Sequence, residues 1–201
     1  MASSQTKLTQ TPSQTVGPYF AYCLTPQQYG YDFANIASGN VASAETEGEH
    51  IRIEGCVLDG AGNPIDDAVI EIWQADSKGR YANPVGPRGS NASFKGFGSR
   101  GTGTDPQKRF TFDTVKPGSV DGKQAPHINV IVLMRGLLLH AFTRIYFSDE
   151  KRANDSDPVL AQVPPKRRDT LIAERTNTPA GTVYRFDIHM QGDRETVFFD
   201  A

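Results

Sequence analysis

The sequence lacks the features that mark several classes of protein. Cysteine is scarce: Cys23 and Cys56 are the only two among 201 residues, and their spacing resembles no metal site. No apolar run approaches the ~20 residues that a membrane helix needs. The first residues carry no apolar segment of the kind found in secretory signals. These absences predict a cytoplasmic chain that stays off the membrane and keeps its thiols reduced.

The sequence also has no large excess of charge of one sign. The 21 Lys and Arg residues nearly balance the 23 Asp and Glu residues, giving a net charge of -2, and the two signs are interspersed. No basic patch therefore argues for a nucleic-acid partner, and no acidic tail argues for disorder. The 19 glycines and 13 prolines favour short strands and many turns. The length suits one domain with a sizeable core.

Alternation of apolar and polar residues predicts strands over most of the chain from His50 onward. Residues 51–58 and 69–73 flank a turn, rich in glycine, at residues 59–64, and this arrangement is typical of a hairpin. Further strands are expected over residues 109–114, 127–134, 138–147, 182–191 and 195–200. With no βαβ alternation and no internal repeat, the pattern predicts an all-β fold: a mixed or antiparallel β-sandwich.

Helical signals are few. Ser148 and the acidic residues after it suit a helix start, and Pro165 is suited to open a second helix that runs to Arg175. These form a small helical insertion in the sandwich. Residues 82–104 read as a long loop. Residues 1–48, with Pro12 and Pro18, are expected to form an extended N-terminal arm that docks on a surface, leaving residues 49–201 as the domain.

The chemistry of two large side chains, Trp73 and Arg135, allows a prediction of where they lie or what they bind. Trp73 is the sole tryptophan, ends an apolar strand and is predicted to lie in the sandwich core. Arg135 ends another apolar strand and is followed by Gly136. Its guanidinium either reaches solvent by snorkelling or clamps the carboxylate of an anionic substrate.

The predicted strand that starts at His127 carries a pattern close to that of a metal site. His127 and Asn129 share one face of this strand, where two histidines could hold a metal ion. An asparagine amide is a poor ligand for a transition metal, so His127 is better explained as bonded to a nearby backbone group. No tyrosine lies between Tyr81 and Tyr146, and Tyr81 is predicted to pack rather than bind. The residues themselves therefore predict no catalytic residue and no metal site.

Six motifs occur in the order found in the intradiol ring-cleavage dioxygenases, which this chain resembles along nearly its whole length. They are Thr11-Pro-Ser-Gln-Thr-Val-Gly-Pro-Tyr19, Glu71-Ile-Trp-Gln-Ala-Asp76 with Gly79-Arg-Tyr81, Thr114-Val-Lys-Pro-Gly118, Ala125-Pro-His-Ile-Asn129, Thr143-Arg-Ile-Tyr-Phe147 and Tyr184-Arg-Phe-Asp-Ile188. Each motif is weak by itself, but six in order are specific.

The resemblance implies a site that this chain keeps only in part. Catalytic chains of the family hold ferric iron with two tyrosines and two histidines, and an arginine precedes the histidines. At the matching positions this chain has His127 and Asn129 for the histidines and Gln124 near the arginine. At the positions that match the two tyrosines, it has Val120 or a neighbouring residue after the Lys116-Pro-Gly118 turn, and no tyrosine in the 82–104 loop. We therefore expect no metal on this chain.

The resemblance is closest to the alpha chain of a two-chain member of the family. Such a chain pairs with a homologous beta chain that holds Fe(3+), in heterodimers within a larger oligomer. The pair is expected to open the ring of 3,4-dihydroxybenzoate with O2, giving 3-carboxy-cis,cis-muconate. On this chain, the resemblance places Arg135 near the substrate carboxylate and Thr15, Gly17, Pro18 and Tyr19 at the pocket mouth. The alternatives are a self-sufficient intradiol enzyme for another catechol and a non-enzymatic β-sandwich binding module.

Overall fold

The computed structural model describes residues 15–17, 19–82 and 93–200, in which strands predominate. The strands are β1 (His50–Leu58), β2 (Val69–Gln74), β3 (Phe97–Gly101), β4 (Arg109–Val115), β5 (His127–Leu133), β6 (Ala141–Phe147), β7 (Ile172–Thr178), β8 (Gly181–Arg185) and β9 (Ile188–His189). The helices are α1 (Phe20–Leu24), α2 (Lys151–Ser156) and three short 3-10 helices, η1 (Pro26–Tyr29), η2 (Leu160–Gln162) and η3 (Pro165–Leu171). None of the described helices is long and apolar enough to cross a bilayer.

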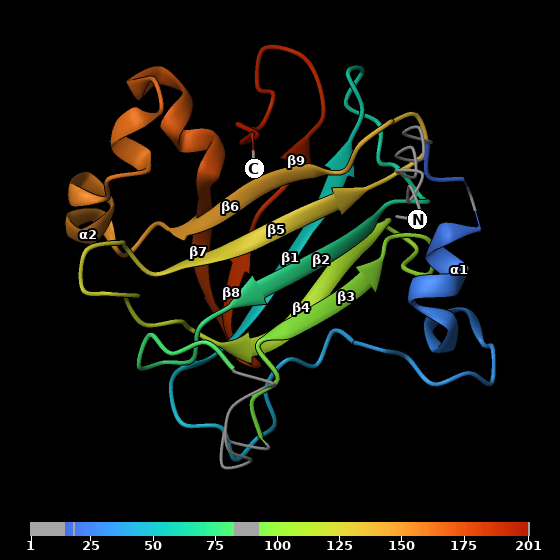
Figure 1. Cartoon of the computed structure of the whole chain (residues 1–201), viewed down its shortest axis with the longest axis horizontal. Helices are drawn as coiled ribbons and strands as arrows, with labels where there is room; N and C mark the ends of the chain where they lie inside the picture. The colour runs from blue at the N-terminus through green and yellow to red at the C-terminus, as the bar shows by residue number, and fades with distance from the viewer. Residues whose placement is uncertain (1–14, 18, 83–92, 201) are drawn as a thin grey trace, which may run out of the picture.

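The strands form one hydrogen-bonded path that folds into two layers (Figure 1). Its order is β3-β2-β5-β6-β7-β8-β1-β4, and β9 pairs with β1. The strands β6 and β7 are parallel, as are β1 and β8, whereas β2–β5 and β5–β6 are antiparallel. The predicted mixed β-sandwich is therefore confirmed.

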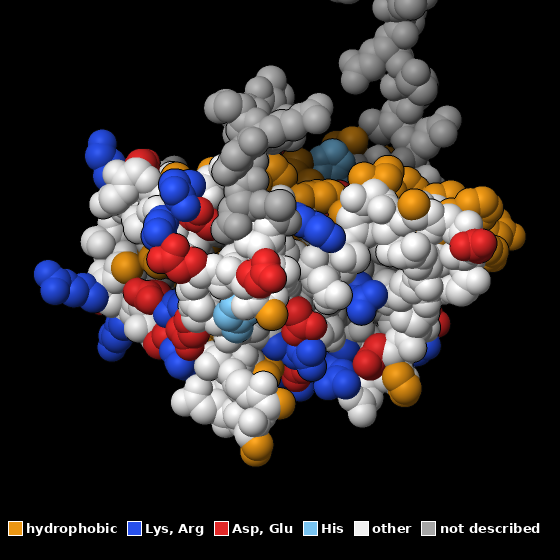
Figure 2. All heavy atoms as spheres, turned by 90° about the horizontal axis from the view of Figure 1, so that it is seen from below, with side chains coloured by type: hydrophobic (Ala, Val, Ile, Leu, Met, Phe, Trp, Pro, Cys, Tyr) orange, Lys and Arg blue, Asp and Glu red, His pale blue; other side chains and the backbone are white. Residues whose placement is uncertain are grey.

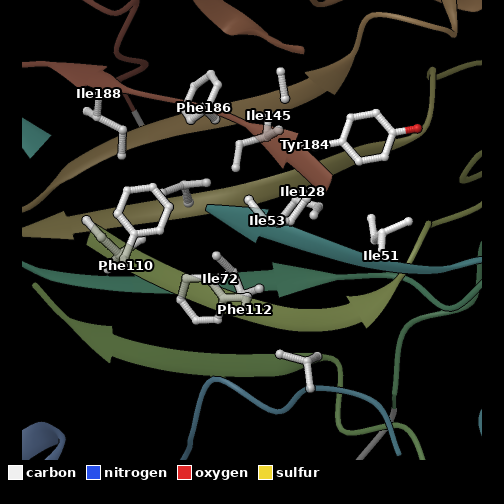
Figure 3. Packing of buried hydrophobic residues seen from close by; sticks show 14 of the residues in the cluster. Ile51, Ile53, Ile72, Phe110, Phe112, Ile128, Ile145, Tyr184, Phe186 and Ile188 are labelled. Atoms are coloured by element: carbon white, nitrogen blue, oxygen red, sulfur yellow. The ribbon is translucent and has the colours of Figure 1, made fainter. Parts of the chain in front are cut away.

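The core lies between the two layers (Figure 3). Ile72 and Ile128 enter it from one layer, and Ile53, Phe112 and Tyr184 from the other, each at most 1% exposed. These residues occupy alternate positions of their strands, which is why the polar or larger residues between them face outward. Burial of each such side chain stabilises the fold by ~1.5–3 kcal/mol.

The predicted hairpin between the first two strands is wrong. The β1 strand pairs with β4 and β8, whereas β2 pairs with β3 and β5 in the other layer. The turn itself exists: Asp59 Oδ1 accepts hydrogen bonds from the amides of Ala61 and Asn63. A turn signal fixes only the local reversal, while burial of both apolar faces places the two strands in opposite layers.

The C-terminal third differs in detail from the prediction. The helix α2 and the 3-10 helix η3 form the small helical insertion, but residues 172–175 belong to β7, which pairs with β6 and β8. The predicted strand over residues 182–191 is broken into β8 and β9. Within residues 195–200, only Phe199 forms a bridge, with Phe142. The predicted loop over residues 82–104 contains β3, which pairs with β2. Pairing with strands distant in the sequence therefore determined where these strands begin and end.

The described part of the N-terminal arm packs on the sandwich. Gln28 binds Gly101 of β3 through two hydrogen bonds, and Val41, 0% exposed, joins the core. Residues 20–29 form α1 and η1 rather than the extended chain that the prolines suggested. Pro26 stands in the first turn of η1, a position that proline tolerates. Cys23 and Cys56 are not joined in a disulfide.

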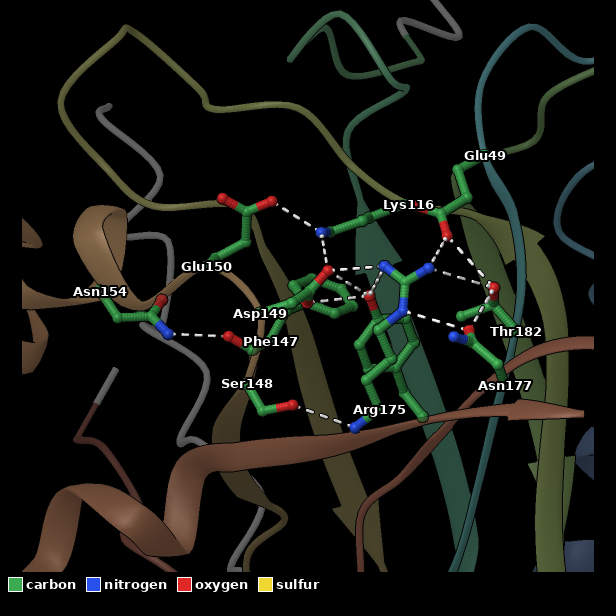
Figure 4. Close-up of polar contacts among 11 residues, drawn as sticks. Glu49, Lys116, Phe147, Ser148, Asp149, Glu150, Asn154, Arg175, Asn177 and Thr182 are labelled. Atoms are coloured by element: carbon green, nitrogen blue, oxygen red, sulfur yellow. Dashed lines mark hydrogen bonds and ion pairs between the residues drawn. The ribbon is translucent and has the colours of Figure 1, made fainter.

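A charge network ties the two layers together at one end of the sandwich (Figure 4). Asp149, after β6, accepts hydrogen bonds from Lys116, Arg175 and Tyr184, of which the first follows β4 and the others lie on β7 and β8. Partial burial would by itself raise the pKa of Asp149, but these hydrogen bonds lower it to about 2. Burial raises the pKa of Tyr184 to about 12.

Candidate functional site

A row of side chains crosses the outer face of the layer that contains β5. The strand register places Phe97 of β3 opposite Trp73 of β2, Trp73 opposite Asn129 of β5, and Asn129 opposite Arg144 of β6. These positions alternate with core residues such as Ile72 and therefore point away from the core. An aromatic pair, an amide and a guanidinium thus lie side by side on this face.

Trp73 is half-buried on this outer face, so the prediction that it lies in the sandwich core is wrong. The core positions of β2 are taken by its neighbours, including Ile70 and Ile72. Its ring instead stacks on Tyr81, with ring centroids 5.9 Å apart and planes inclined by 7°, and lies 6.1 Å from Phe97. The alternation was present in the sequence, because Trp73 shares its face with Glu71, but the apolar character of the ring favoured a core position.

Tyr81 packs as predicted, but it also reaches the candidate site. The Nδ2 atom of Asn129 donates a hydrogen bond of 3.2 Å to the Tyr81 hydroxyl. A tight turn presents this tyrosine: the amides of Lys78 and Arg80 both donate to Asp76 Oδ1. The sequence predicted that Tyr81 packs rather than binds, because a turn flanks it. The signal that could have found it is the motif that ends in Gly79-Arg80-Tyr81.

His127 is fixed as the sequence suggested, by a backbone group. Its Nδ1 lies 2.8 Å from the carbonyl oxygen of Ala125, and the residue is 3% exposed. Burial lowers the pKa of His127, so the ring is neutral at pH 7. The start of β5 is held by the buried carboxylate of Asp157, which accepts hydrogen bonds from the Ala125 amide and the Tyr146 hydroxyl.

These donors do not fit the ferric site that the resemblance implies. The cluster offers one phenol, one imidazole and one amide, whereas that site needs two phenolates and two imidazoles. The phenol of Tyr81 accepts a hydrogen bond from Asn129, and His127 is committed to the Ala125 carbonyl. Among the described residues, no three His, Cys, Asp or Glu side chains gather as a metal site. Ferric iron favours hard, anionic oxygen ligands, which an amide does not replace.

A cavity of about 530 Å³, which we call the outer-face pocket, opens above this row of side chains. Its lining is mainly apolar, with Arg144 and Glu71 as charged groups on the strands and Asp200 on the C-terminal segment. Its other lining residues are Ile72, Trp73, Phe97, Asn129, Val130, Ile131, Phe142, Thr143, Val159 and Phe199. The antiparallel bridge between Phe142 and Phe199 holds the C-terminal segment beside it.

A second cluster forms where the chain leaves β5. The Gly136 amide donates a hydrogen bond of 3.1 Å to Thr15 Oγ1, which brings the N-terminal segment to the turn that carries Arg135. The Arg135 side chain is 58% exposed and forms an ion pair with Asp67. Tyr19 is 76% exposed and Gly17 starts the turn into α1, while Pro18 lies outside the described residues. The structure therefore brings Thr15 and Arg135 into one neighbourhood.

On the surface of the described residues, charged side chains of opposite sign lie next to one another. Figure 2 shows Lys and Arg side chains beside Asp and Glu side chains over the face in view. Arg52 pairs with Asp113 and Arg185 with Asp187, which illustrates this local neutralisation. A nucleic-acid surface would need basic side chains gathered without such partners.

Comparison with known proteins gives close relatives along the whole chain. The family model described as Dioxygenase matches residues 17–192. The chain is 54% identical to the protocatechuate 3,4-dioxygenase alpha chain of Burkholderia cepacia, over 98% of this chain and 100% of that protein. It is 42% identical to the alpha chain of Pseudomonas putida, over 96% and 97% of the two proteins. Similarity to the beta chain of Burkholderia cepacia is weaker, at 28% identity over 79% of this chain and 71% of that protein.

Solved structures share the fold at low identity. The dioxygenase domain of a carbohydrate-binding fusion protein from Streptomyces sp. SirexAA-E covers 93% of this chain and is itself covered in full, with a TM-score of 0.61 and 21% identity. Catechol 1,2-dioxygenase from Acinetobacter sp. ADP1 has a TM-score of 0.58 and 17% identity, with coverage of 90% of this chain and 74% of that one. At these identities the likeness concerns the fold alone.

Proposed function

This chain belongs to the dioxygenase family, and we propose that it serves as the alpha chain of a protocatechuate 3,4-dioxygenase. The observation that carries this proposal is the 54% identity over 98% of the chain to an alpha chain. The lower identity to the beta chain, 28%, favours the alpha role. The pair would open the ring of 3,4-dihydroxybenzoate with O2, yielding 3-carboxy-cis,cis-muconate.

The partner in this proposal is a homologous beta chain, with alpha-beta pairs joined in a larger oligomer. The beta chain would hold the Fe(3+), because Tyr81, Asn129 and His127 do not supply a ferric donor set. Iron on the partner would act as a Lewis acid toward the two ring hydroxyls. A cytoplasmic location belongs to the same proposal and agrees with cysteines that form no disulfide.

Arg135 is the residue by which this chain would recognise the substrate carboxylate. Its guanidinium is 58% exposed on the turn after β5 and is therefore open to a group brought by substrate or partner. The ion pair with Asp67 restrains the side chain, so less rotamer freedom remains to be lost on binding. A planar guanidinium matches a carboxylate in a bidentate geometry, which a lysine would not reproduce.

The N-terminal segment would line the pocket mouth beside this arginine. The hydrogen bond between Thr15 and Gly136 connects that segment directly to the arginine-bearing turn. Gly17, Pro18 and Tyr19 continue it, and the exposed ring of Tyr19 offers apolar surface toward a partner or ligand. In this arrangement the chain contributes the pocket mouth and the positive charge of Arg135, while the reactive centre belongs to the beta chain.

Co-expression with the beta chain tests the proposal. The assembled pair is expected to consume O2 and 3,4-dihydroxybenzoate in equal amounts, whereas this chain alone is expected to be inactive. Activity of the purified single chain, accompanied by a visible tyrosinate-to-iron band, would favour a self-sufficient enzyme instead. Failure to form a complex with the beta chain would also contradict the proposal.

A further inference from the structure

The ends of β2 and β5 bring a carboxylate and a guanidinium together. The two strands are antiparallel, and the outermost pair of their register joins Val69 to Leu133. Two residues further along the chain from each stand Asp67, before β2, and Arg135, after β5. Figure 1 shows β2 beginning and β5 ending toward the side of the molecule where α1 lies. Asp67 and Arg135 therefore form a cross-strand ion pair just beyond the paired residues.

The two members of this pair differ in exposure and in the atoms that they use. The Asp67 side chain is 15% exposed, whereas the Arg135 side chain is 58% exposed. The contact joins Asp67 Oδ2 to Arg135 Nε, at the base of the guanidinium. A guanidinium donates from a planar fork, so a partner at Nε leaves the outer edge, formed by Nη1 and Nη2, for a second carboxylate. The aspartate thus holds the arginine from the protein side.

The carboxylate of Asp67 is not used to stabilise its own turn. Asp59 and Asp76, by contrast, each accept hydrogen bonds from backbone amides two and four residues later. Among the described residues, the buried Oδ2 atom of Asp67 accepts no hydrogen bond of this kind, so its charge is compensated by the ion pair with Arg135. Asp67 is therefore suited to orient the guanidinium rather than to shape the backbone.

The segment that carries Asp67 is anchored to the end of β3. Thr102 follows this strand and donates a hydrogen bond of 2.7 Å from its hydroxyl to the carbonyl oxygen of Ile65. Its amide donates a second bond, of 2.9 Å, to the carbonyl oxygen of Ala68. Thr102 is 0% exposed, so water does not compete for these bonds. The backbone is fixed on both sides of Asp67, and the carboxylate has a defined place from which to hold Arg135.

We propose that Asp67 is a positioning residue, which holds Arg135 so that its Nη1 and Nη2 edge meets the substrate carboxylate. The inference rests on the proposed function, in which Arg135 recognises that carboxylate. An exposed arginine samples many rotamers, and ordering it on binding opposes affinity. With Asp67 in place, part of this ordering is complete before the substrate arrives. Asp67 acts through Arg135 and does not itself contact the substrate.

Two effects of Asp67 on substrate binding have opposite signs. Its negative charge weakens the attraction of Arg135 for an anion, whereas its contact with Nε restrains the guanidinium. The first effect is screened by water and salt, because the Arg135 side chain is 58% exposed. Restraint of the side chain is not screened in this way. Removal of the Asp67 carboxylate is therefore expected to weaken binding of the substrate, not to strengthen it.

Steady-state kinetics of the assembled enzyme with 3,4-dihydroxybenzoate measure this effect. Asp67→Ala should lower kcat/KM by roughly 5- to 30-fold, mainly through KM, a factor that corresponds to the rotamer freedom of one arginine. Asp67→Asn keeps an oxygen that accepts a hydrogen bond from Nε, so it should lose less than Asp67→Ala. Asp113→Ala is the matched control, because it breaks another cross-strand pair, with Arg52, and should leave kcat/KM unchanged.

A double-mutant cycle separates this inference from the proposed function. If Asp67 acts through Arg135, Asp67→Ala should cause no further loss in an Arg135→Ala background. If Asp67→Ala does not fold or assemble, the isosteric Asp67→Asn takes its place in the same cycle.

An unchanged or lower KM in Asp67→Ala, or an equal loss with and without Arg135, would overturn the positioning role even though Arg135→Ala impairs the enzyme. If Arg135→Ala itself leaves kcat/KM unchanged, the proposed role of Arg135 fails, and the positioning role fails with it.

Discussion

The amide of Asn129 donates a hydrogen bond of 3.2 Å to the hydroxyl of Tyr81, across 48 positions of the sequence. A histidine at the position of Asn129 would present a ring nitrogen lone pair to the same neighbour. The amide N–H instead donates a hydrogen bond, so the phenol oxygen acts as a hydrogen-bond acceptor. Because of this contact, the side chains of Asn129 and Tyr81 bind each other and are not available together as ligands of a metal ion.

We expect the isolated chain to bind no stoichiometric iron and to lack ring-cleavage activity. Metal analysis after purification in the presence of iron should give far less than one iron per chain. The pair assembled with the beta chain serves as the control and should contain about one iron per pair. About one tightly held iron in the isolated chain would show that Tyr81 and His127 recruit ligands that we have not assigned.

Substitution Arg135→Ala in the assembled enzyme should raise KM for 3,4-dihydroxybenzoate. Loss of one charge-assisted contact costs ~1.5–3 kcal/mol of transition-state binding, or roughly 10- to 150-fold in kcat/KM. Steady-state kinetics measure this directly, and iron content and oligomer size should stay unchanged. Because Arg135 also pairs with Asp67, a thermal unfolding measurement should accompany the kinetics.

Catechol provides the matched substrate control for Arg135, since it lacks the carboxylate. Its turnover should change far less than that of 3,4-dihydroxybenzoate. A matched protein control is Arg185→Ala, which removes another exposed arginine paired with a neighbouring aspartate. Equal losses on both substrates, or disassembly of the complex, would make Arg135 a structural residue.

Replacement of Trp73 should destabilise the chain less than replacement of a core aromatic residue. Trp73 is half-buried on the outer face, so Trp73→Ala should lower the free energy of unfolding by ~1–3 kcal/mol. Phe112, 0% exposed, is the comparison, and Phe112→Ala should cost ~3–5 kcal/mol. Urea unfolding of both variants gives the two free energies of unfolding. A loss for Trp73→Ala that equals or exceeds the loss for Phe112→Ala would contradict the half-buried position of the Trp73 ring.

Asp149→Asn should destabilise the chain in a pH-dependent way. The pKa of Asp149 is about 2 in the folded chain, below the ~3.9 of an unfolded aspartate. A lowered carboxyl pKa contributes stability that is present above the unfolded value and disappears as the pH falls through the folded value. Loss of its hydrogen bonds with Lys116, Arg175 and Tyr184 should cost ~1–3 kcal/mol at pH 7.

Urea titrations of the unmodified chain and Asp149→Asn from pH 7 down to pH 2 measure this effect. The difference between them should stay constant down to about pH 5 and then shrink toward pH 2. Asp155→Asn is a suitable control, because this carboxylate stands on α2 and takes part in none of the network's ion pairs. A difference that is independent of pH would mean that the charge of Asp149 contributes little.

Local patterns in the sequence determined much of the strand content. Period-two alternation located β4, β5 and β6, because a half-buried sheet requires one apolar face. The absence of βαβ units gave the sandwich class, and the motif around His127 and Asn129 marked the altered site. These features depend on neighbours along the chain, so the sequence carries them directly.

Tertiary structure alone decided which of these elements meet. The sequence could not place β1 and β2 in opposite layers, because pairing depends on which faces bury most area. Nor could it bring Thr15 to Gly136 or Tyr81 to Asn129, since these contacts span long stretches of chain. Trp73 is an exception, because Glu71 lies two residues before it on the same face of β2 and Ile70 and Ile72 face the core. Its place on the outer face was therefore already present in the alternation of the sequence.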